Sequence, residues 1–330
     1  MRYTRDILLD LAKELVEKRY AQDPKVDAVF LVGSVRPEDA AIEGPTDVDL
    51  LVLHNGEIPR ERELVKISAE YHFDIFFEET NLYSNPKDLR SDGWRGWTMW
   101  DPYLLLQRGR FFEYTQSILR SQFDEPKYIL ARVRNFAESA RKSWARFDAD
   151  PAKVTPREYL KAVYSAGNAF ACLARSPYTK RNFLSQFYTQ ATEMEAADLV
   201  PALMDCVSDG RLVDTVLAGL DEWEQCFALA TQAYANYTVH PLRLNYYKDA
   251  ITKQAQSDFP ASSLWPYAFT WAYIAEESKE NKHIHTAWGK VGKELGLSAD
   301  KLPIRLRALD QFLEQIEEII AQVSDDYGVD

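Results

Sequence analysis

The sequence predicts an α/β domain, with a mixed sheet and flanking helices, followed by an all-α helical bundle. Short apolar runs bounded by turn residues, typical of strands, occur in the first part of the chain. From about Glu125 onward, apolar residues recur at helical spacing over long segments. The composition, 46% hydrophobic and 27% charged, is that of a globular protein long enough to bury two cores. We expect domains at residues 1–115 and 116–330.

The first domain begins with a predicted helix at residues 5–20, where apolar side chains recur every three or four positions between Glu and Lys. Runs rich in Val, Leu, Ile and Phe then predict strands. A helix-like stretch separates the second and third strands, and a Trp-rich connector precedes a short helix and a fourth strand. The predicted strands are residues 26–32, 48–53, 72–77 and 110–114, and the predicted helices between them are residues 59–70 and 102–107.

The second domain consists of amphipathic segments without a fixed repeat length or recurring signature residues. A helical bundle is therefore a simpler interpretation than a solenoid. The segments that we expect to be helical are residues 127–147, 156–174, 193–207, 212–234, 263–277 and 304–323.

Charge and cysteine usage exclude several classes of protein. The formal net charge of -12 disfavours a general nucleic-acid binder, because affinity for the phosphate backbone comes from clustered Lys and Arg. The three cysteines are widely spaced and form no CxxC motif, which predicts neither a disulfide framework nor a zinc ribbon. The N-terminus is amphipathic, and no stretch is apolar enough to span a bilayer. We expect a cytoplasmic protein that binds no membrane.

Gly33 and Ser34 follow the first predicted strand. A strand that ends in Gly-Ser presents a turn where a phosphate can approach the backbone, and the hydroxyl and the following amides can donate hydrogen bonds to it. This pattern predicts a phosphate cradle without the lysine of a P-loop.

Three aspartates complete the predicted site. Asp47 and Asp49 lie two positions apart, so on a strand both carboxylates point to one face while Val48 and Leu50 enter the core. Asp74 offers a third carboxylate from the next strand, within an otherwise apolar run. Carboxylates that face one space repel each other unless a cation lies between them, and Mg²⁺ prefers oxygen ligands. We expect the aspartates to bind Mg²⁺, with Asp74 as a ligand or as general base.

Residues 31–50, with Asp74 by position and context, resemble the nucleotidyltransferase superfamily related to DNA polymerase beta. Its pattern is an apolar strand, Gly-Ser or Gly-Gly, a short loop, Asp-x-Asp or Asp-x-Glu, and a later acidic residue on a strand. The resemblance covers roughly residues 1–115. It implies that the early carboxylates bind Mg²⁺ on a nucleoside triphosphate, while an acceptor hydroxyl attacks the α-phosphorus and pyrophosphate leaves.

The layout of a small catalytic domain before a helical bundle is similar to that of aminoglycoside-type adenylyltransferases, in which the bundle forms one wall of the substrate cleft. This resemblance implies ATP as the donor of AMP and a small hydroxylated acceptor, such as an aminoglycoside-like antibiotic. Residues 169–183 resemble a helix and loop that supply a lysine to the triphosphate in such enzymes. The corresponding residue here is Lys180, with Arg181 as second choice.

The sequence leaves alternatives open. The same scaffold would serve an enzyme acting on an RNA end or a protein, or a catalytically silent module that binds a nucleotide. Glu78 and Glu79 closely follow Asp74 and are rival candidates for the general base. His283 and His285 would not share a face on a helix, so we expect no metal role for this pair. Base preference, the number of metal ions and oligomeric state also stay open.

Overall fold

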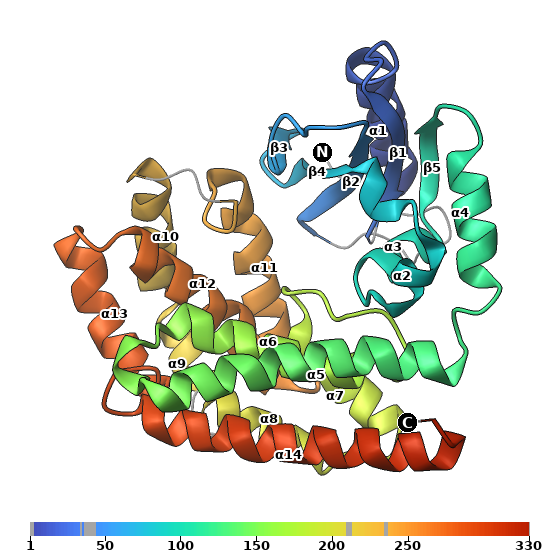
Figure 1. The fold of residues 1–330 in the computed structure, drawn as a ribbon. Helices are drawn as coiled ribbons and strands as arrows, with labels where there is room; N and C mark the ends of the chain where they lie inside the picture. The colour runs from blue at the N-terminus through green and yellow to red at the C-terminus, as the bar shows by residue number, and fades with distance from the viewer. Residues whose placement is uncertain (1–2, 34, 36–43, 209–212, 234–236, 330) are drawn as a thin grey trace. The chain divides into compact units, whose positions relative to one another are not determined.

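A five-stranded mixed sheet forms the first unit of the chain, Met1–Tyr128 (Figure 1). The computed structural model describes residues 3–33, 35, 44–208, 213–233 and 237–329. The strand order is β3-β4-β2-β1-β5; β2 and β4 are parallel, and the other neighbouring pairs are antiparallel. The strands are β1 (Val26–Val32), β2 (Thr46–His54), β3 (Arg62–Lys66), β4 (Tyr71–Glu79) and β5 (Tyr103–Gln107).

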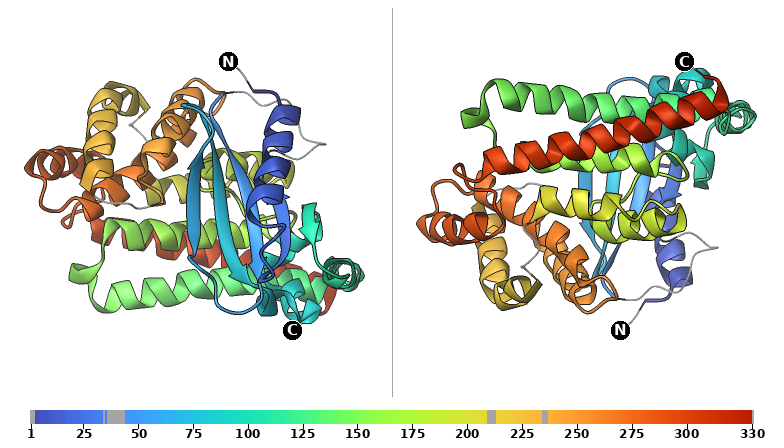
Figure 2. Two further views of the ribbon diagram at one scale, coloured as in Figure 1. Left: turned by 90° about the horizontal axis from the view of Figure 1, so that it is seen from above. Right: turned by 90° about the horizontal axis from the view of Figure 1, so that it is seen from below.

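Helices cover both faces of this sheet. Residues of β1 and β2 alternate between two cores, as the period of a strand requires. One core holds Leu31 and Leu50 together with residues of α1 (Arg5–Arg19), which lies along one face (Figure 2). The other holds Phe30 and Leu51 with side chains from the opposite helical layer. That layer consists of η1 (Thr80–Tyr83), α2 (Pro86–Ser91), α3 (Arg95–Trp100) and α4 (Phe111–Arg120).

The prediction of a helix at residues 59–70 was wrong, because this segment contains β3. The strand pairs antiparallel with β4, and a turn in which the Ser68 hydroxyl oxygen accepts from the backbone amides of Glu70 and Tyr71 connects them. β3 is a terminal strand of the sheet, where charged side chains are tolerated and help to prevent unwanted strand pairing. The many charged residues of β3 therefore gave its sequence the pattern of the polar face of a helix.

The predicted order of elements at the end of this unit was also wrong. Residues 102–107 were expected to be helical but form β5, whose Tyr103 pairs with Leu31 of β1. Residues 110–114 were expected to be a strand but begin α4, which buries Phe112, Thr115 and Leu119. The helical spacing of these buried residues becomes visible only beyond residue 114. Residues 110–114 alone were therefore too few to indicate a helix.

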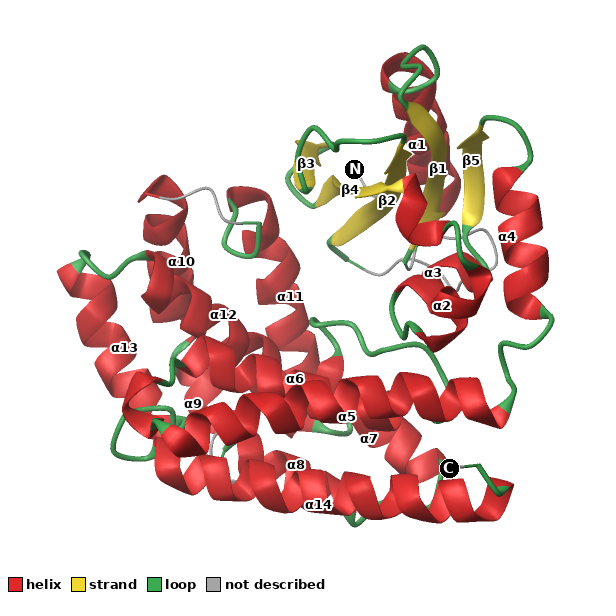
Figure 3. Cartoon of the chain, in the orientation of Figure 1, coloured by secondary structure: helices red, strands yellow, loops and turns green. Residues whose placement is uncertain are grey.

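Helices form the second unit, Ile129–Asp330, and every strand of the described residues belongs to the first unit (Figure 3). The boundary expected at residue 115 falls inside α4, whereas the chain divides after Tyr128. The remaining elements are α5 (Pro126–Ala149), η2 (Pro151–Lys153), α6 (Pro156–Ala171), α7 (Phe183–Glu193), α8 (Leu199–Val207), α9 (Val213–Ala218), α10 (Leu220–Ala233), η3 (Pro241–Arg243), α11 (Leu244–Ala255), η4 (Pro260–Ser263), α12 (Leu264–Glu277), α13 (Lys282–Glu294) and α14 (Leu302–Tyr327).

Two features organise the helical unit. Helix α12 is buried along Leu264 to Ile274, the burial pattern of a helix surrounded by others. Helices α5 and α14 lie side by side, and Arg141 of α5 binds Asp310 at 2.5 Å and both carboxylate oxygens of Glu317 at 2.7–2.8 Å. Within the described part of the chain, no helix combines the length and the apolar character needed to cross a membrane.

The helix expected at residues 193–207 begins later, at Leu199. Helix α7 ends at Glu193, Glu195 has a positive φ of 56°, and α8 begins at Leu199. A non-glycine residue in this left-handed region ends the helical hydrogen-bond ladder. Helices α7, α11 and α13 were not predicted.

The side chain of Tyr159 connects three helices in the core of this unit. It lies on α6, is fully buried, and its hydroxyl group donates toward the carbonyl oxygens of Cys206 at 2.8 Å and Arg305 at 3.0 Å. These carbonyls belong to α8 and α14. Burial raises the pKa of the Tyr159 hydroxyl well above its ordinary value, so the group remains a proton donor.

We expect Tyr159→Phe to lower the free energy of unfolding by about 1–3 kcal/mol, because two buried carbonyl oxygens lose a hydrogen-bond donor. Urea unfolding measures this change. Tyr188→Phe is the matched control, because that ring stacks on Phe259 and is 38% exposed. Equal stability of the two variants would show that the hydroxyl contributes nothing.

Candidate functional site

Strand β2 positions the first two carboxylates. Asp47 and Asp49 point to one face, while Val48 and Leu50 pack into the core beneath α1. The alternation inferred from the sequence is therefore present. Asp47 is buried, with 7% of its surface exposed, and Asp49 is half-buried.

The register of three strands brings the remaining groups to this point. Asp49 lies opposite Asp74 of β4 on one side and Val32 of β1 on the other. Because β2 and β4 run parallel and in register, the side chains of Asp49 and Asp74 point to the same face. One oxygen from each of Asp47, Asp49 and Asp74 lies within 4.8 Å of the others. The structure thus brings the three predicted carboxylates together.

Asp74 has a cationic partner that sequence reasoning missed. Its side chain is fully buried, and Arg62 of β3 binds both carboxylate oxygens: Nε donates to Oδ1 at 2.5 Å and Nη2 donates to Oδ2. This bidentate geometry fixes the carboxylate plane and balances its charge. The signal was hidden because Arg62 lay in the segment expected to be a helix. Asp74 is therefore not a solvated aspartate at a sheet edge.

The donor set fits a hard divalent cation. Three carboxylates so close together repel each other, and the pairing of Arg62 with Asp74 offsets part of that charge. Oxygen ligands from two or three carboxylates, completed by water or phosphate oxygens, are what Mg²⁺ binds in proteins. Asp47, Asp49 and Asp74 would hold such an ion together.

Gly33 lies directly beside this group. It follows β1 with a φ of +74°, a left-handed conformation that favours glycine. A Cβ atom at this position would overlap Oδ2 of Asp49. Glycine is therefore required both by the backbone conformation and by the space that the Asp49 carboxylate occupies. Ser34, the other residue of the predicted phosphate cradle, lies outside the described residues.

The rival bases occupy other positions. Glu78 lies four residues beyond Asp74, about 13 Å along the strand. It accepts hydrogen bonds from the Tyr83 hydroxyl at 2.6 Å and from Arg95 Nε at 3.0 Å. Burial, together with the charge of Glu78, raises the pKa of Tyr83 well above its ordinary value. Glu79 accepts from Asn81 Nδ2 at 2.9 Å. Neither glutamate belongs to the carboxylate group.

Lys180 belongs to the second unit, in the segment between α6 and α7. Its side chain is exposed, and its ammonium nitrogen lies 5.9 Å from the centre of the Phe269 ring. Arg181, the second choice, pairs with Asp249 at 3.5 Å and lies over the ring of Tyr246. A triphosphate contact by Lys180 stays a prediction.

Comparisons with known proteins give a structural similarity with a low TM-score. No protein-family model and no curated protein sequence matches the chain. Among solved structures, the chain is similar to a nucleotidyltransferase-like protein from Exiguobacterium sibiricum 255-15, with 13% sequence identity, a TM-score of 0.30, and coverage of 87% of this chain and 88% of that one. A similarity with this TM-score assigns neither fold nor function.

We expect Gly33→Ala to weaken binding of Mn²⁺, used as a probe for Mg²⁺, by at least about 10-fold, because the new methyl group displaces Asp49 from its fellow ligands. Isothermal titration calorimetry measures the affinity. Gly56→Ala is the matched control: Gly56 also has a positive φ, of 86°, but a Cβ atom there meets no atom within 4 Å. We expect Gly56→Ala to strain the backbone to a similar extent but to leave the Mn²⁺ affinity unchanged. Unchanged affinity in Gly33→Ala would contradict the geometry.

We expect Arg62→Met to lower the free energy of unfolding by about 1–3 kcal/mol, less than the roughly 3–5 kcal/mol of a fully buried pair, because a third of the Arg62 side chain is exposed. Urea unfolding without divalent cations measures the change. Arg60→Met serves as control, since Arg60 forms a surface ion pair with Glu63 and such pairs contribute about 0–1 kcal/mol. If both variants were equally stable, Arg62 would not stabilise Asp74.

Proposed function

We propose that this chain is a Mg²⁺-dependent nucleotidyltransferase that transfers a nucleoside monophosphate, with ATP as the expected donor, to a hydroxyl group of a small molecule. The observation that carries the proposal is the group formed by Asp47, Asp49 and Asp74, whose oxygens lie within 4.8 Å of one another. Gly33 supports it, because the missing side chain lets the Asp49 carboxylate lie against the backbone at the end of β1.

The proposed reaction is a displacement at phosphorus. The acceptor hydroxyl oxygen forms a bond to the α-phosphorus, the bond from that phosphorus to the bridging oxygen breaks, and pyrophosphate leaves with the bond electrons. The hydroxyl proton passes to solvent. When bound, Mg²⁺ would neutralise charge on the phosphate oxygens and on the leaving group.

Each side chain has its own role in positioning the cation and the phosphates. Asp47 and Asp49 hold the cation from one strand, so their separation is set by the strand geometry rather than by loop conformation. Asp74 completes the ligand set. Both of its oxygens accept hydrogen bonds from Arg62. These bonds orient the carboxylate, which suits a metal ligand better than a general base. We therefore assign Asp74 to metal binding. The proposed phosphate contacts are the backbone near Gly33, Ser34, and the side chain of Lys180.

The carboxylates also argue against a silent module. A site that only recognised a nucleotide would have no need for three crowded carboxylates, whose repulsion opposes folding. The net charge of -12 favours a small acceptor over an RNA end. A protein as the acceptor is one of the alternatives that the activity assay examines.

The test is pyrophosphate release from each of the four nucleoside triphosphates with Mg²⁺, across a panel of aminoglycosides, other hydroxylated small molecules, RNA ends and proteins. Release with a small molecule supports the proposal and identifies the acceptor class. Release only with RNA or protein would replace the proposed acceptor. Mg²⁺-dependent nucleotide binding without release from any member of the panel would favour the silent module.

We expect Asp49→Asn to lower the transfer rate at least about 1,000-fold, because a charged ligand to the cation and to the developing transition-state charge is lost. Asp47→Asn should behave alike. Circular dichroism should show both variants folded. Glu79→Gln is the control, since Glu79 lies on β4 but bonds to Asn81 away from the cluster. Retained turnover in both aspartate variants would exclude the proposed mechanism.

A further inference from the structure

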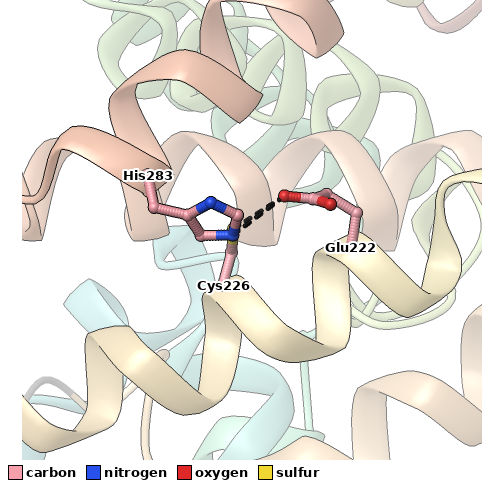
Figure 4. A group of neighbouring side chains, drawn as sticks. All are labelled: Glu222, Cys226 and His283. Carbon is pink, nitrogen blue, oxygen red and sulfur yellow. Dashed lines mark hydrogen bonds and ion pairs between the residues drawn. The ribbon is translucent and has the colours of Figure 1, made fainter.

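A second group of metal-ligating side chains lies in the helical unit. Glu222 and Cys226 are four residues apart on α10, so they share one face of that helix, and His283 reaches them from the first turn of α13. Figure 4 shows the His283 ring and the Glu222 carboxylate turned toward each other, with Cys226 one turn along the same helix as Glu222. One donor atom of each residue lies within 4.8 Å of the others.

The spacing of these donor atoms matches a tetrahedral zinc ion. Metal–ligand bonds of about 2.0–2.1 Å to nitrogen, 2.0–2.2 Å to oxygen and 2.3 Å to sulfur place a nitrogen and an oxygen ligand about 3.4 Å apart, and a sulfur and an oxygen ligand about 3.6 Å apart. His283 Nε2 lies 3.0 Å from Glu222 Oε1, and Cys226 Sγ lies 3.9 Å from the same oxygen. Both separations are within about half an ångström of the tetrahedral values.

The three ligands differ in solvent exposure, and the difference suits a metal site with one open position. Cys226 is buried, whereas the side chains of His283 and Glu222 are 50% and 44% exposed. An ion can therefore enter from the side of the histidine and the carboxylate, where water can supply a fourth ligand. Burial, followed by the charge of Glu222, raises the pKa of the Cys226 thiol to about 12. Coordination removes the thiol proton outright, so binding would release a proton.

We propose that Glu222, Cys226 and His283 form a binding site for Zn²⁺, with water as the fourth ligand. The thiolate and imidazole are softer donors than the oxygens of the aspartate site, so the two sites would select different metals. The zinc ion would connect α10 to the start of α13. In the sequence His283 stands close to His285 of the same helix, whereas its partners in the folded chain lie on α10.

The experiment is titration of the full-length, metal-free protein with Co²⁺, a spectroscopic substitute for Zn²⁺. We expect one equivalent to produce the near-ultraviolet charge-transfer absorption of a cobalt–thiolate bond, and Zn²⁺ to abolish it. Cys226→Ser should lose the band. His283→Ala should weaken Zn²⁺ affinity by at least about 10- to 100-fold, since it removes a direct ligand. Absence of the band at saturating Co²⁺, or its persistence in Cys226→Ser, would overturn the proposal.

Matched variants separate this site from the rest of the protein. His285→Ala removes an exposed histidine two positions away, and Cys172→Ser removes a buried thiol elsewhere in the same unit. Both should keep the band and the wild-type Zn²⁺ affinity. Asp49→Asn should also keep the band, because the carboxylate site contains no sulfur. A band lost in Cys172→Ser but kept in Cys226→Ser would place the thiolate elsewhere.

Discussion

The parallel pairing of β2 with β4 is the constraint on which the candidate site depends. It places Asp49 opposite Asp74 with both side chains on one face, and it does so inside a sheet where one of these carboxylates has no contact with water. Two like charges so placed oppose folding unless cations compensate them. Arg62 supplies one positive charge from the neighbouring strand. The proposed Mg²⁺ would supply further positive charge, which would join the stability of the sheet to the chemistry of the site.

Much of this site could be inferred from the sequence because strand geometry is local. The alternation of Asp47 and Asp49 with Val48 and Leu50 determines which side chains share a face, and apolar neighbours identify the strand around Asp74. Arg62 could not be inferred in the same way. Its role depends on which strand lies beside β4, and pairing between strands leaves little trace in a single sequence.

The helical unit shows the same limit. Amphipathic periodicity indicated most of its long helices, including α5 and α14, but gave no sign of α7, α11 and α13 or of the non-helical residues that precede α8. Contacts between helices were also out of reach. His283 has its partners on α10, about sixty residues earlier, and no spacing rule connects positions so far apart.

The position of β3 has a consequence for solubility. As a terminal strand it carries backbone groups along an outer edge, and charged side chains such as Arg62, Glu63 and Lys66 are a common protection against edge-to-edge aggregation. One of these charges is also the partner of Asp74. The residues that keep the sheet from adding further strands are thus partly the same residues that organise its carboxylates. Evolution cannot alter the aggregation resistance of this edge at position 62 without altering the charge of the site.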